Sequence, residues 1–334
     1  MHNISDIFLE REEQYLSPYA FLTKNTKGRE KPQTPCRNRT EFQRDRDRIL
    51  HCKSFRRLMH KTQVFFSPTD EHYRTRMTHT LEVTQVARII ARALRLNEDL
   101  CEAAALGHDL GHTPFGHAGE TAMQRCFDPG FTHYKQSLRV VDHLEKDGQG
   151  LNLTYEVRDA ILNHTGDCMA STLEGVIVKY ADRIAYINHD IDDACRAGIL
   201  TQDELPHDLL EILGNTHSGR INTMVTSVIE ASRDRDRITM TEEIGQATMA
   251  LRDFLRRKVY TASLAKADEE KAIDLLVSLY QYFCENPEKM PSLYFNNIPT
   301  DGLERCVCDY ISGMTDRYAI NMYEDIFIPK VWKG

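Results

Sequence analysis

The chain has no long hydrophobic run. Its purely apolar stretches span only a few residues, such as 103–106, whereas a membrane-spanning helix needs about 20 apolar residues in succession. The first 15 residues carry mixed charge and no apolar core, so the sequence does not predict a secretory signal. We therefore expect a cytoplasmic protein that has no membrane partner.

Paired cysteines are also missing. The nine cysteines are scattered, their number is odd, and no Cys-x-x-Cys spacing occurs. This pattern is typical of small buried side chains in a reducing compartment. It does not indicate a disulfide framework or a thiolate metal site.

Positive charge is in the minority, because 42 Lys and Arg residues face 50 Asp and Glu residues, which gives a net charge of -8. This balance argues against a protein that coats nucleic acid. Basic residues nevertheless gather in residues 37–61, which we call the basic segment. Such a cluster suits a small polyanionic ligand, or it forms a solvated helix face in which Asp45 and Asp47 are the partners.

Strand signals are few, with one candidate at residues 63–66, and helical periodicity dominates. An apolar stripe runs along residues 80–94, formed by Leu81, Val83, Val86, Ile89, Ile90, Ala93 and Leu94. Further helices are predicted at 100–106, 137–145, 155–163, 174–194, 220–231, 242–260, 270–284 and 303–311. The sequence thus predicts an all-α fold with few or no short strands, as one helical domain over 1–334 with an irregular basic N-terminal arm.

The strongest chemical signal lies between residues 106 and 120. Thirteen positions hold His108, Asp109, His112, His117 and Glu120, interrupted by glycines. Burying so many unpaired polar groups for packing alone would be costly, so we interpret this stretch as a functional loop. Adjacent His108 and Asp109 can converge on one ion only at a helix end.

The predicted helix 174–194 carries a second set of ligand-type residues. At about 100° per residue, four of them fall within roughly 80° of one another: Lys179, Asp182, Tyr186 and Asp190. Aliphatic residues occupy the other side. An ordinary solvent-facing polar side is the alternative for this helix alone. Imidazole and carboxylate ligands together would suit a divalent ion.

With His79 at the start of the helix 80–94, the set His79, His108-Asp109 and Asp182 resembles the H…HD…D signature of the HD phosphohydrolase superfamily. A wider series resembles the deoxynucleoside triphosphate triphosphohydrolases, including the bacterial dGTPase-like proteins. It comprises Arg46-Asp-Arg-Ile-Leu-His51, Phe55-Arg-Arg-Leu58, Lys61-Thr-Gln-Val-Phe65, Arg76-Met-Thr-His79, the 108–120 loop, Gln136-Ser-Leu-Arg-Val-Val141 and Ala181-Asp-Arg-Ile-Ala-Tyr-Ile-Asn-His-Asp190. The resemblance implies an HD-domain fold with a catalytic core over about 37–198 and a helical C-terminal part over about 199–334.

The resemblance further implies hydrolysis of a deoxynucleoside triphosphate (dNTP), dGTP or more broadly, to deoxynucleoside and inorganic triphosphate. Its metal ligands would be His79, His108, Asp109 and Asp182. We expect Mg or Mn, with Fe, Co, Ni or Zn as alternatives. His117 and Glu120 would form the catalytic pair, with His117 acting as general acid or as general base.

Substrate-binding residues follow from the same resemblance, except Lys179, which rests on helix facing. The expected set is Gln63, Arg76, His112, His133, Lys179, Arg183, Tyr186 and Asp190. Tyr186 would pack under the deoxyribose, while Asp190 and Gln63 would contact the 3′-hydroxyl. His164 at a helix end is a weaker candidate, because capping explains it equally well.

Family members form tetramers or hexamers, so we expect a homo-oligomer, and an allosteric nucleotide is a further expected partner. Two other functions stay open. One is a different HD phosphohydrolase or phosphodiesterase, acting on nucleoside monophosphates, cyclic nucleotides or an alarmone. The other is a nucleotide-sensing protein that binds single-stranded nucleic acid through the basic segment.

Overall fold

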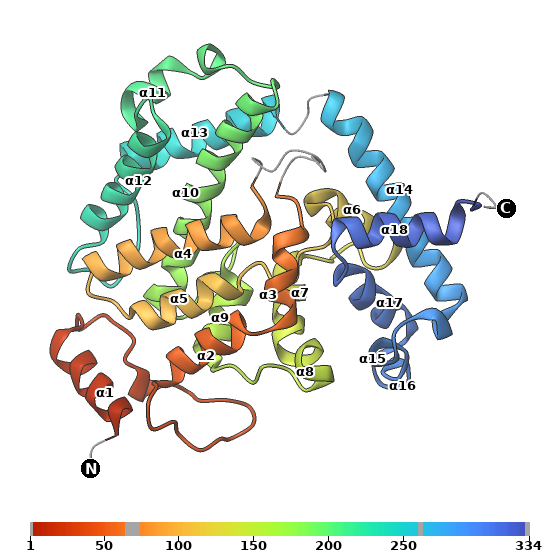
Figure 1. The fold of residues 1–334 in the computed structure, drawn as a ribbon. Helices are drawn as coiled ribbons and strands as arrows, with labels where there is room; N and C mark the ends of the chain where they lie inside the picture. Colours follow the sequence, from red (N-terminus) through yellow and green to blue (C-terminus); the bar gives the residue numbers. More distant parts are fainter. Residues whose placement is uncertain (1–2, 64–73, 260–262, 331–334) are drawn as a thin grey trace.

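The computed structural model describes residues 3–63, 74–259 and 263–330, and over these residues it contains helices but no β-strand (Figure 1). Extended pairing there is limited to two isolated bridges, Arg29 with Thr154 and Thr62 with Thr75. The predicted all-α fold is therefore confirmed. Of the strand candidate 63–66, residues 64–66 lie outside the described residues.

Helices α4 and α10 form the centre of the molecule, and α5 and α9 pack beside them (Figure 1). The bounds are α4 (Arg76–Ala93), α5 (Glu98–Gly107), α9 (Tyr155–Asn163), α10 (Leu173–Arg196), α11 (His207–Leu213), α12 (His217–Ser232) and α13 (Glu242–Lys258). One hydrophobic cluster runs through α4, α5 and α10 to α12 and α13. In the predicted stripe of α4, Val83, Val86 and Ile90 are buried, but Leu81 and Ile89 are exposed.

Over residues 3–63, the N-terminal part contains three α-helices, the first separated from the other two by a largely irregular stretch over 16–40. The predicted irregular arm therefore holds for that stretch but is wrong for most of the basic segment. It contains α1 (Ile4–Tyr15), α2 (Glu41–Leu50) and α3 (Lys53–Arg57). Thr40 begins α2 as a capping box, because its hydroxyl accepts from the Gln43 N–H and the Gln43 side chain accepts from the Thr40 N–H. Helix α2 buries Phe42 and Ile49 and packs on α5, which fixes the basic segment on the central bundle.

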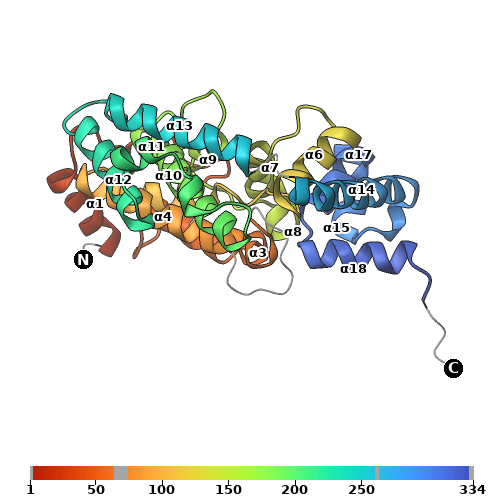
Figure 2. The ribbon, with the colours of Figure 1, turned by 90° about the horizontal axis from the view of Figure 1, so that it is seen from above.

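A second hydrophobic cluster holds the C-terminal helices to α6. The bounds are α6 (Gly116–Cys126), α14 (Ser263–Glu285), α15 (Ser292–Phe295), α16 (Ile298–Asp301), α17 (Leu303–Ser312) and α18 (Asp316–Phe327). Both ribbon views place α1 and α18 at opposite ends of the molecule (Figures 1 and 2). Because α6 carries His117 and Glu120 in its first turns, this cluster fixes the position of two predicted site residues.

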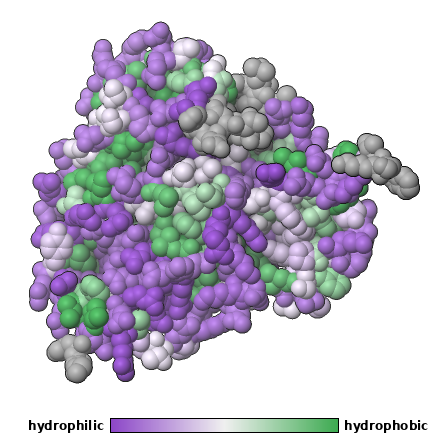
Figure 3. Space-filling view, viewed as in Figure 1, coloured by the Kyte–Doolittle hydropathy of each residue, from purple (hydrophilic) through white to green (hydrophobic). Residues whose placement is uncertain are grey.

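Helices α7 (His133–Arg139) and α8 (Glu145–Gly148) are joined by a π-helical turn at Val140–Leu144. The helix predicted at 137–145 thus begins four residues earlier and is not regular throughout. Among the described residues, no helix combines the length and apolar character that crossing a bilayer requires. The face in Figure 3 carries hydrophilic side chains between separate hydrophobic patches.

Candidate active site

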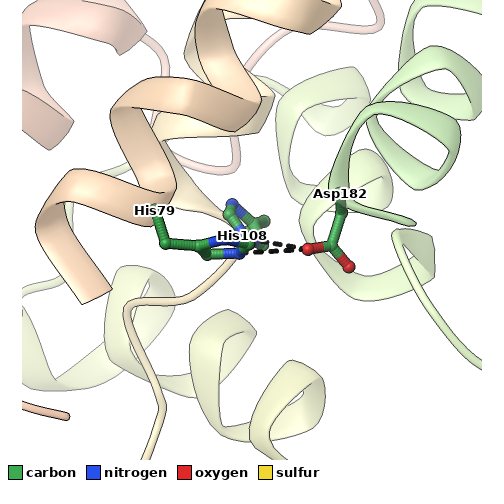
Figure 4. A group of neighbouring side chains, drawn as sticks. All are labelled: His79, His108 and Asp182. Atoms are coloured by element: carbon green, nitrogen blue, oxygen red, sulfur yellow. Dashed lines mark hydrogen bonds and ion pairs between the residues drawn. The ribbon is translucent and has the colours of Figure 1, made fainter. Parts of the chain in front are cut away.

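His79, His108 and Asp182 come together from three separate elements (Figure 4). Thr75 caps α4, so His79 lies in its first turn; His108 directly follows α5; Asp182 lies in the middle of α10. The Nε2 atom of His79 lies 3.1 Å from Asp182 Oδ1, and that of His108 lies 3.9 Å from the same oxygen. One ligand atom from each residue lies within 4.8 Å of the others, so the three can surround a single ion.

The two imidazoles are held so that Nε2 faces this point. His108 Nδ1 lies 2.6 Å from the Ala105 carbonyl, which only accepts, so Nδ1 carries the proton and Nε2 offers a lone pair. His108 Nε2 is buried and has no hydrogen-bond partner among the described residues. A buried nitrogen lone pair facing a second imidazole and a carboxylate is the donor set that divalent metals prefer.

The second ring nitrogen of His79 lies beside another histidine, which in turn contacts a carboxylate. His79 Nδ1 is 3.4 Å from His189 Nδ1, and His189 Nε2 is 2.8 Å from Glu82 Oε2.

Asp182 has a lowered pKa. Burial alone would raise the pKa of its carboxyl group, but the hydrogen bond from His79 and the neighbouring His108 outweigh burial and lower the pKa to about 2. Asp182 is therefore a negatively charged carboxylate at neutral pH, as a metal ligand would have to be.

Asp109, the fourth predicted ligand, lies beside this trio. Its Oδ2 accepts a 2.9 Å hydrogen bond from Arg76 and is 3.9 Å from His79 Nε2. Its Oδ1 lies 3.5 Å from the Nε2 atoms of both His108 and His112. The carboxylate also forms a second potential ligand group with His133 and His164. The structure thus places Asp109 between two groups of donors.

The predicted catalytic pair begins α6. Phe115 (φ 61°) and Gly116 (φ 55°) turn the chain in the left-handed region before the helix, and a Cβ at Gly119 would lie 2.0 Å from the Pro114 carbonyl. His117 Nδ1 is 3.9 Å from Glu120 Oε2, with the His117 side chain 73% exposed. The two side chains thus lie near each other, and the His117 imidazole lines the cleft described below.

Glu120 contacts His133 more closely than it contacts His117. It accepts from the His133 backbone N–H at 3.1 Å and lies 3.3 Å from His133 Nδ1. Burial raises the pKa of Glu120, but hydrogen bonds with His117 and His133 lower it below its usual range. The sequence did not predict this contact, because Glu120 and His133 are on different helices.

Histidines 112, 133 and 164 continue the cluster. The rings of His112 and His133 are stacked with centroids 4.2 Å apart, and His133 Nε2 lies 3.4 Å from His164 Nε2. Burial, with some help from His108 and His133, lowers the pKa of His164 to about 3. His164, which the sequence left ambiguous, is therefore a neutral imidazole in the middle of the site.

A cleft of about 380 Å³ opens over these groups. Its lining residues are Gln63, Arg76, His79, Asp109, His112, His117, His133, Thr165, Asp182, Tyr186, Asp190, Arg252 and Arg256. On its α10 side, burial and the nearby Asp182 raise the pKa of Tyr186 to about 12. Burial and the charges of Asp193 and Asp182 raise the pKa of Asp190 well above its usual range.

Two predicted substrate contacts are not among the lining residues. Lys179 Nζ donates to the carbonyls of Gly166 at 2.6 Å and Cys168 at 3.0 Å, and Arg183 is also outside the cleft lining. The lining also contains two cationic residues that the sequence did not predict as site residues, Arg252 and Arg256 on α13. Their spacing of four places them on one helix face, but the sequence does not say what that face meets.

The chain matches two family descriptions, HD domain over residues 76–187 and phosphohydrolase-associated domain over residues 238–325. It is 55% identical, over 98% of its length and 97% of the relative's, to a deoxyguanosinetriphosphate triphosphohydrolase-like protein of Caldanaerobacter subterraneus subsp. tengcongensis. Proteins of that name from Desulfatibacillum aliphaticivorans (98% of each chain) and Clostridium tetani (94% and 93%) are 47% and 45% identical.

Among solved structures, a phosphohydrolase from Bacteroides thetaiotaomicron is similar with a TM-score of 0.53 and 17% identity, covering 84% of this chain and 67% of that one. At this identity the likeness supports the fold alone.

Proposed function

The chain belongs to the HD-domain family of deoxyguanosinetriphosphate triphosphohydrolase-like proteins, and on that premise we propose that it hydrolyses deoxynucleoside triphosphates to deoxynucleoside and inorganic triphosphate. The HD phosphohydrolase family makes it a hydrolase. The substrate, the bond that is cut and the dependence on a divalent ion are parts of the proposal.

One observation carries the proposal: two residues of the His79, His108 and Asp182 ligand group, His79 and Asp182, line a cleft that also carries arginine, tyrosine and carboxyl side chains. Arg76, Arg252 and Arg256 line this cleft, and arginine suits the several negative charges of a triphosphate. Tyr186 and Asp190 line its α10 side. The same cleft therefore offers contacts for a polyanion and for a sugar next to the ligand group.

His79, His108 and Asp182 would hold the ion, and Asp109 lies beside them. A divalent cation at this position would polarise the α-phosphate and stabilise the negative charge that develops there. We propose Mg or Mn, with Fe, Co, Ni or Zn as alternatives that the same ligands accept.

In the proposed reaction, the oxygen of a water molecule bonds to the α-phosphorus and the bond to the sugar 5′-oxygen breaks. The electron pair stays on the 5′-oxygen, which takes up a proton, and the oxygen from water remains in the triphosphate. His117 is the proton-transfer group that the cleft offers, with Glu120 close to Nδ1. It either protonates the 5′-oxygen or accepts the proton of the water.

The roles of the remaining residues are taken from the family resemblance, for those that line the cleft. Arg76, His112 and His133 would contact the phosphates, with Arg252 and Arg256 joining them in place of Lys179. Tyr186 would pack under the deoxyribose and leave no room for a 2′-hydroxyl. Asp190 and Gln63 would hydrogen-bond the 3′-hydroxyl.

Three further proposals rest on the family alone. We propose that the protein forms a homo-oligomer (a tetramer or hexamer), that a nucleotide activates it at a separate site, and that the catalytic core over about 37–198 is followed by a helical part over about 199–334. Binding of single-stranded nucleic acid stays a secondary proposal.

The test is to incubate the purified protein with each dNTP, singly and mixed, with Mg or Mn, and to separate the products by anion-exchange chromatography. Release of deoxynucleoside and triphosphate is the expected result. Release of orthophosphate or pyrophosphate would instead support another HD phosphohydrolase. Activity that appears only in mixtures would indicate nucleotide activation.

A further inference from the structure

We propose that Asp316, the first residue of α18, is a positioning residue for the catalytic pair, because its carboxylate ties the entry of α6 to the segment 61–63. The inference deepens the proposed function, and its kinetic part rests on that function. Asp316 lies in the stretch that matches the phosphohydrolase-associated domain, whereas His117 lies in the stretch that matches the HD domain. Asp316 itself is not among the residues that line the cleft.

Both oxygens of Asp316 accept hydrogen bonds from outside α18. Oδ2 accepts from the Thr62 N–H at 2.8 Å and from the Thr62 hydroxyl at 2.6 Å, and Oδ1 accepts from the Phe115 N–H at 2.9 Å. Helix α18 does not need this carboxylate as its cap, because the Thr315 hydroxyl accepts from the Tyr318 N–H. The carboxylate therefore joins two segments that lie far apart in the sequence.

The entry of α6 depends on contacts with other parts of the chain. Phe115 has a left-handed backbone (φ 61°), which costs conformational energy and persists only where the surroundings hold it. Its side chain cannot cap α6, which begins at the next residue. Asp316 binds the N–H of Phe115, two positions before His117. The direction in which α6 leaves this turn, and with it the position of His117 and Glu120, therefore depends on the Asp316 carboxylate.

The segment 61–63 lies against the same turn. A Cβ on Gly116 would lie 3.1 Å from both the Gln63 carbonyl and a guanidinium nitrogen of Arg76. The Arg76 guanidinium also donates to the Gln63 carbonyl at 3.3 Å. Gln63, Arg76 and His117 all line the cleft, so a shift of this segment against the turn would change the spacing of residues that hold the substrate in the proposed function.

Lys61 joins the same regions from a second point. Its side chain is buried, with 2% exposed, and its ammonium group donates to the His112 carbonyl and, at 2.8 Å, to the Ser312 carbonyl. His112 lies in the histidine-rich loop, and Ser312 is the last residue of α17. A cation and an anion thus both connect the loop, the segment 61–63 and the C-terminal helices, and Asp316 is the one that contacts the turn before His117.

A purely structural role is the competing explanation, in which Asp316 only holds α18 against the rest of the protein. The two roles differ in what changes when the carboxylate is lost. Loss of a docking contact would loosen α18 itself. Loss of a positioning contact would loosen the turn at Phe115 and the segment 61–63, while α18 stays folded and the chemistry slows.

Hydrogen–deuterium exchange of full-length protein with MnCl₂, followed by mass spectrometry, separates the two roles. Asp316→Asn keeps the shape of the side chain but replaces one acceptor oxygen by an N–H donor. We expect faster exchange in the peptides that contain Thr62 and Phe115 and unchanged exchange in peptides of α18. The kcat for triphosphate release should fall by about 10- to 100-fold, as expected for a misplaced catalytic group. The Mn²⁺ stoichiometry should not change, because Asp316 belongs to neither ligand group.

Asp325→Asn is the matched control. It makes the same substitution on the same helix, at an exposed residue that pairs with Lys330, and should change neither kcat nor exchange at Phe115. Thr62→Val removes only the hydroxyl contact and should lower kcat less than Asp316→Asn does. Because both changes act through one carboxylate, the double variant should lose less kcat than the product of the two single losses.

An unchanged kcat, or unchanged exchange at Phe115, in Asp316→Asn would overturn the positioning role, and so would faster exchange throughout α18. If this variant does not fold, Thr62→Val decides by the same two measurements. If the unaltered protein releases no triphosphate, the proposed function fails and exchange alone decides. Acceleration confined to the Thr62 and Phe115 peptides would then keep Asp316 as the residue that fixes the turn, and no acceleration would refute it.

Discussion

The basic segment (residues 37–61) and the polar face of α10 are both rich in charged residues, but they use their charges differently. Within the basic segment, Arg39 and Arg46 pair with Asp47 at 2.6 and 3.1 Å, and Arg48 donates to main-chain carbonyls of residues 151 and 152. On α10, Asp182, Tyr186 and Asp190 face the cleft. A cluster of charged residues in a sequence indicates a ligand site only if, in the folded protein, their side chains line a cleft and are not paired with other protein groups.

The interpretation of the basic segment as a helix face with internal partners is thus closer to the structure than a polyanion site. Asp47 pairs within the segment, while Asp45 pairs with Arg29 outside it and accepts from the Thr154 N–H and hydroxyl at 2.8 and 2.7 Å. These contacts tie α2 to the residues before α9. We therefore expect substitutions in the basic segment to change stability and those on α10 to change chemistry.

The largest effect is expected from Asp182→Ala. Removing the carboxylate leaves His79 and His108 without the anionic ligand, so metal binding and turnover should both be lost while the fold remains. Asp47→Ala is the matched control, because it removes an aspartate from a helix without touching the cleft. Calorimetry with Mn²⁺ and a triphosphate-release assay measure both variants. Retained metal binding in Asp182→Ala would remove this residue from the site.

Next comes His117→Ala, which should lower kcat by about 10²–10⁴-fold, the range typical of a lost general acid or base. The metal stoichiometry should not change, since His117 is not in either ligand group. Steady-state kinetics and metal titration on the same preparation test whether kcat falls while the metal stoichiometry stays unchanged. An unchanged kcat would show that His117 does not transfer the proton.

In the basic segment, removing Asp45 from its buried pair with Arg29 should lower the free energy of unfolding. Asp45→Ala removes one of the two carboxylates that pair with Arg29, in a pair whose side chains are 4% (Arg29) and 0% (Asp45) exposed. Because Glu41 still pairs with Arg29 at 2.6 Å, the expected cost is that of unsatisfied buried donors, about 1–3 kcal/mol. Urea denaturation followed by circular dichroism measures this loss, and the folded fraction should keep its kcat. Loss of kcat at unchanged stability would place Asp45 in the chemistry instead.

A smaller change in selectivity is expected from Tyr186→Ala. Opening the space under the sugar should raise the ratio of kcat/KM for ribonucleotides over deoxyribonucleotides by about ten-fold. Tyr186→Phe keeps the ring and should keep the selectivity. If the alanine variant neither accepts ribonucleotides nor loses dNTP turnover, the sugar contact is wrongly assigned.

The smallest effect concerns Glu174 at the start of α10, which lies far from the ligands. Burial raises its pKa from 4.5 to about 7, although backbone N–H groups of Asn97 and Phe21 oppose the shift. A raised pKa stabilises the fold below pH 4.5, and that contribution is lost as the pH rises through about 7. Glu174→Gln should therefore add about 1–3 kcal/mol at pH 8 and little at pH 4.5, as measured by urea denaturation. A gain that does not depend on pH would contradict this.

The sequence predicts α4, α9 and α10 well, because their apolar residues follow the helical period and they end near polar or capping residues. It predicts α2 and α3 poorly, since charged residues occupy most of the positions that are not buried and the buried apolar residues are few: Phe42, Ile49, Cys52 and Phe55. It also missed α6, which has glycines at positions 116 and 119 and whose first residue, like Phe115 before it, has a positive φ angle.

Within the site, positions that belong to the family signature were predictable, and contacts outside that signature were not. The convergence of His79, His108 and Asp182 followed from the family signature. The contact between Glu120 and His133 depends on how α6 packs against α7, and the arginines of α13 depend on which face of that helix meets the cleft. Neither is determined by local periodicity.

The bond that is cut is the most direct test of a metal-dependent triphosphohydrolase. Hydrolysis of dGTP in ¹⁸O-labelled water, followed by mass spectrometry of both products, should place one ¹⁸O atom in inorganic triphosphate and none in deoxyguanosine. Label in the deoxynucleoside, in a nucleotide, in pyrophosphate or in orthophosphate would contradict attack at the α-phosphorus with the 5′-oxygen as leaving group.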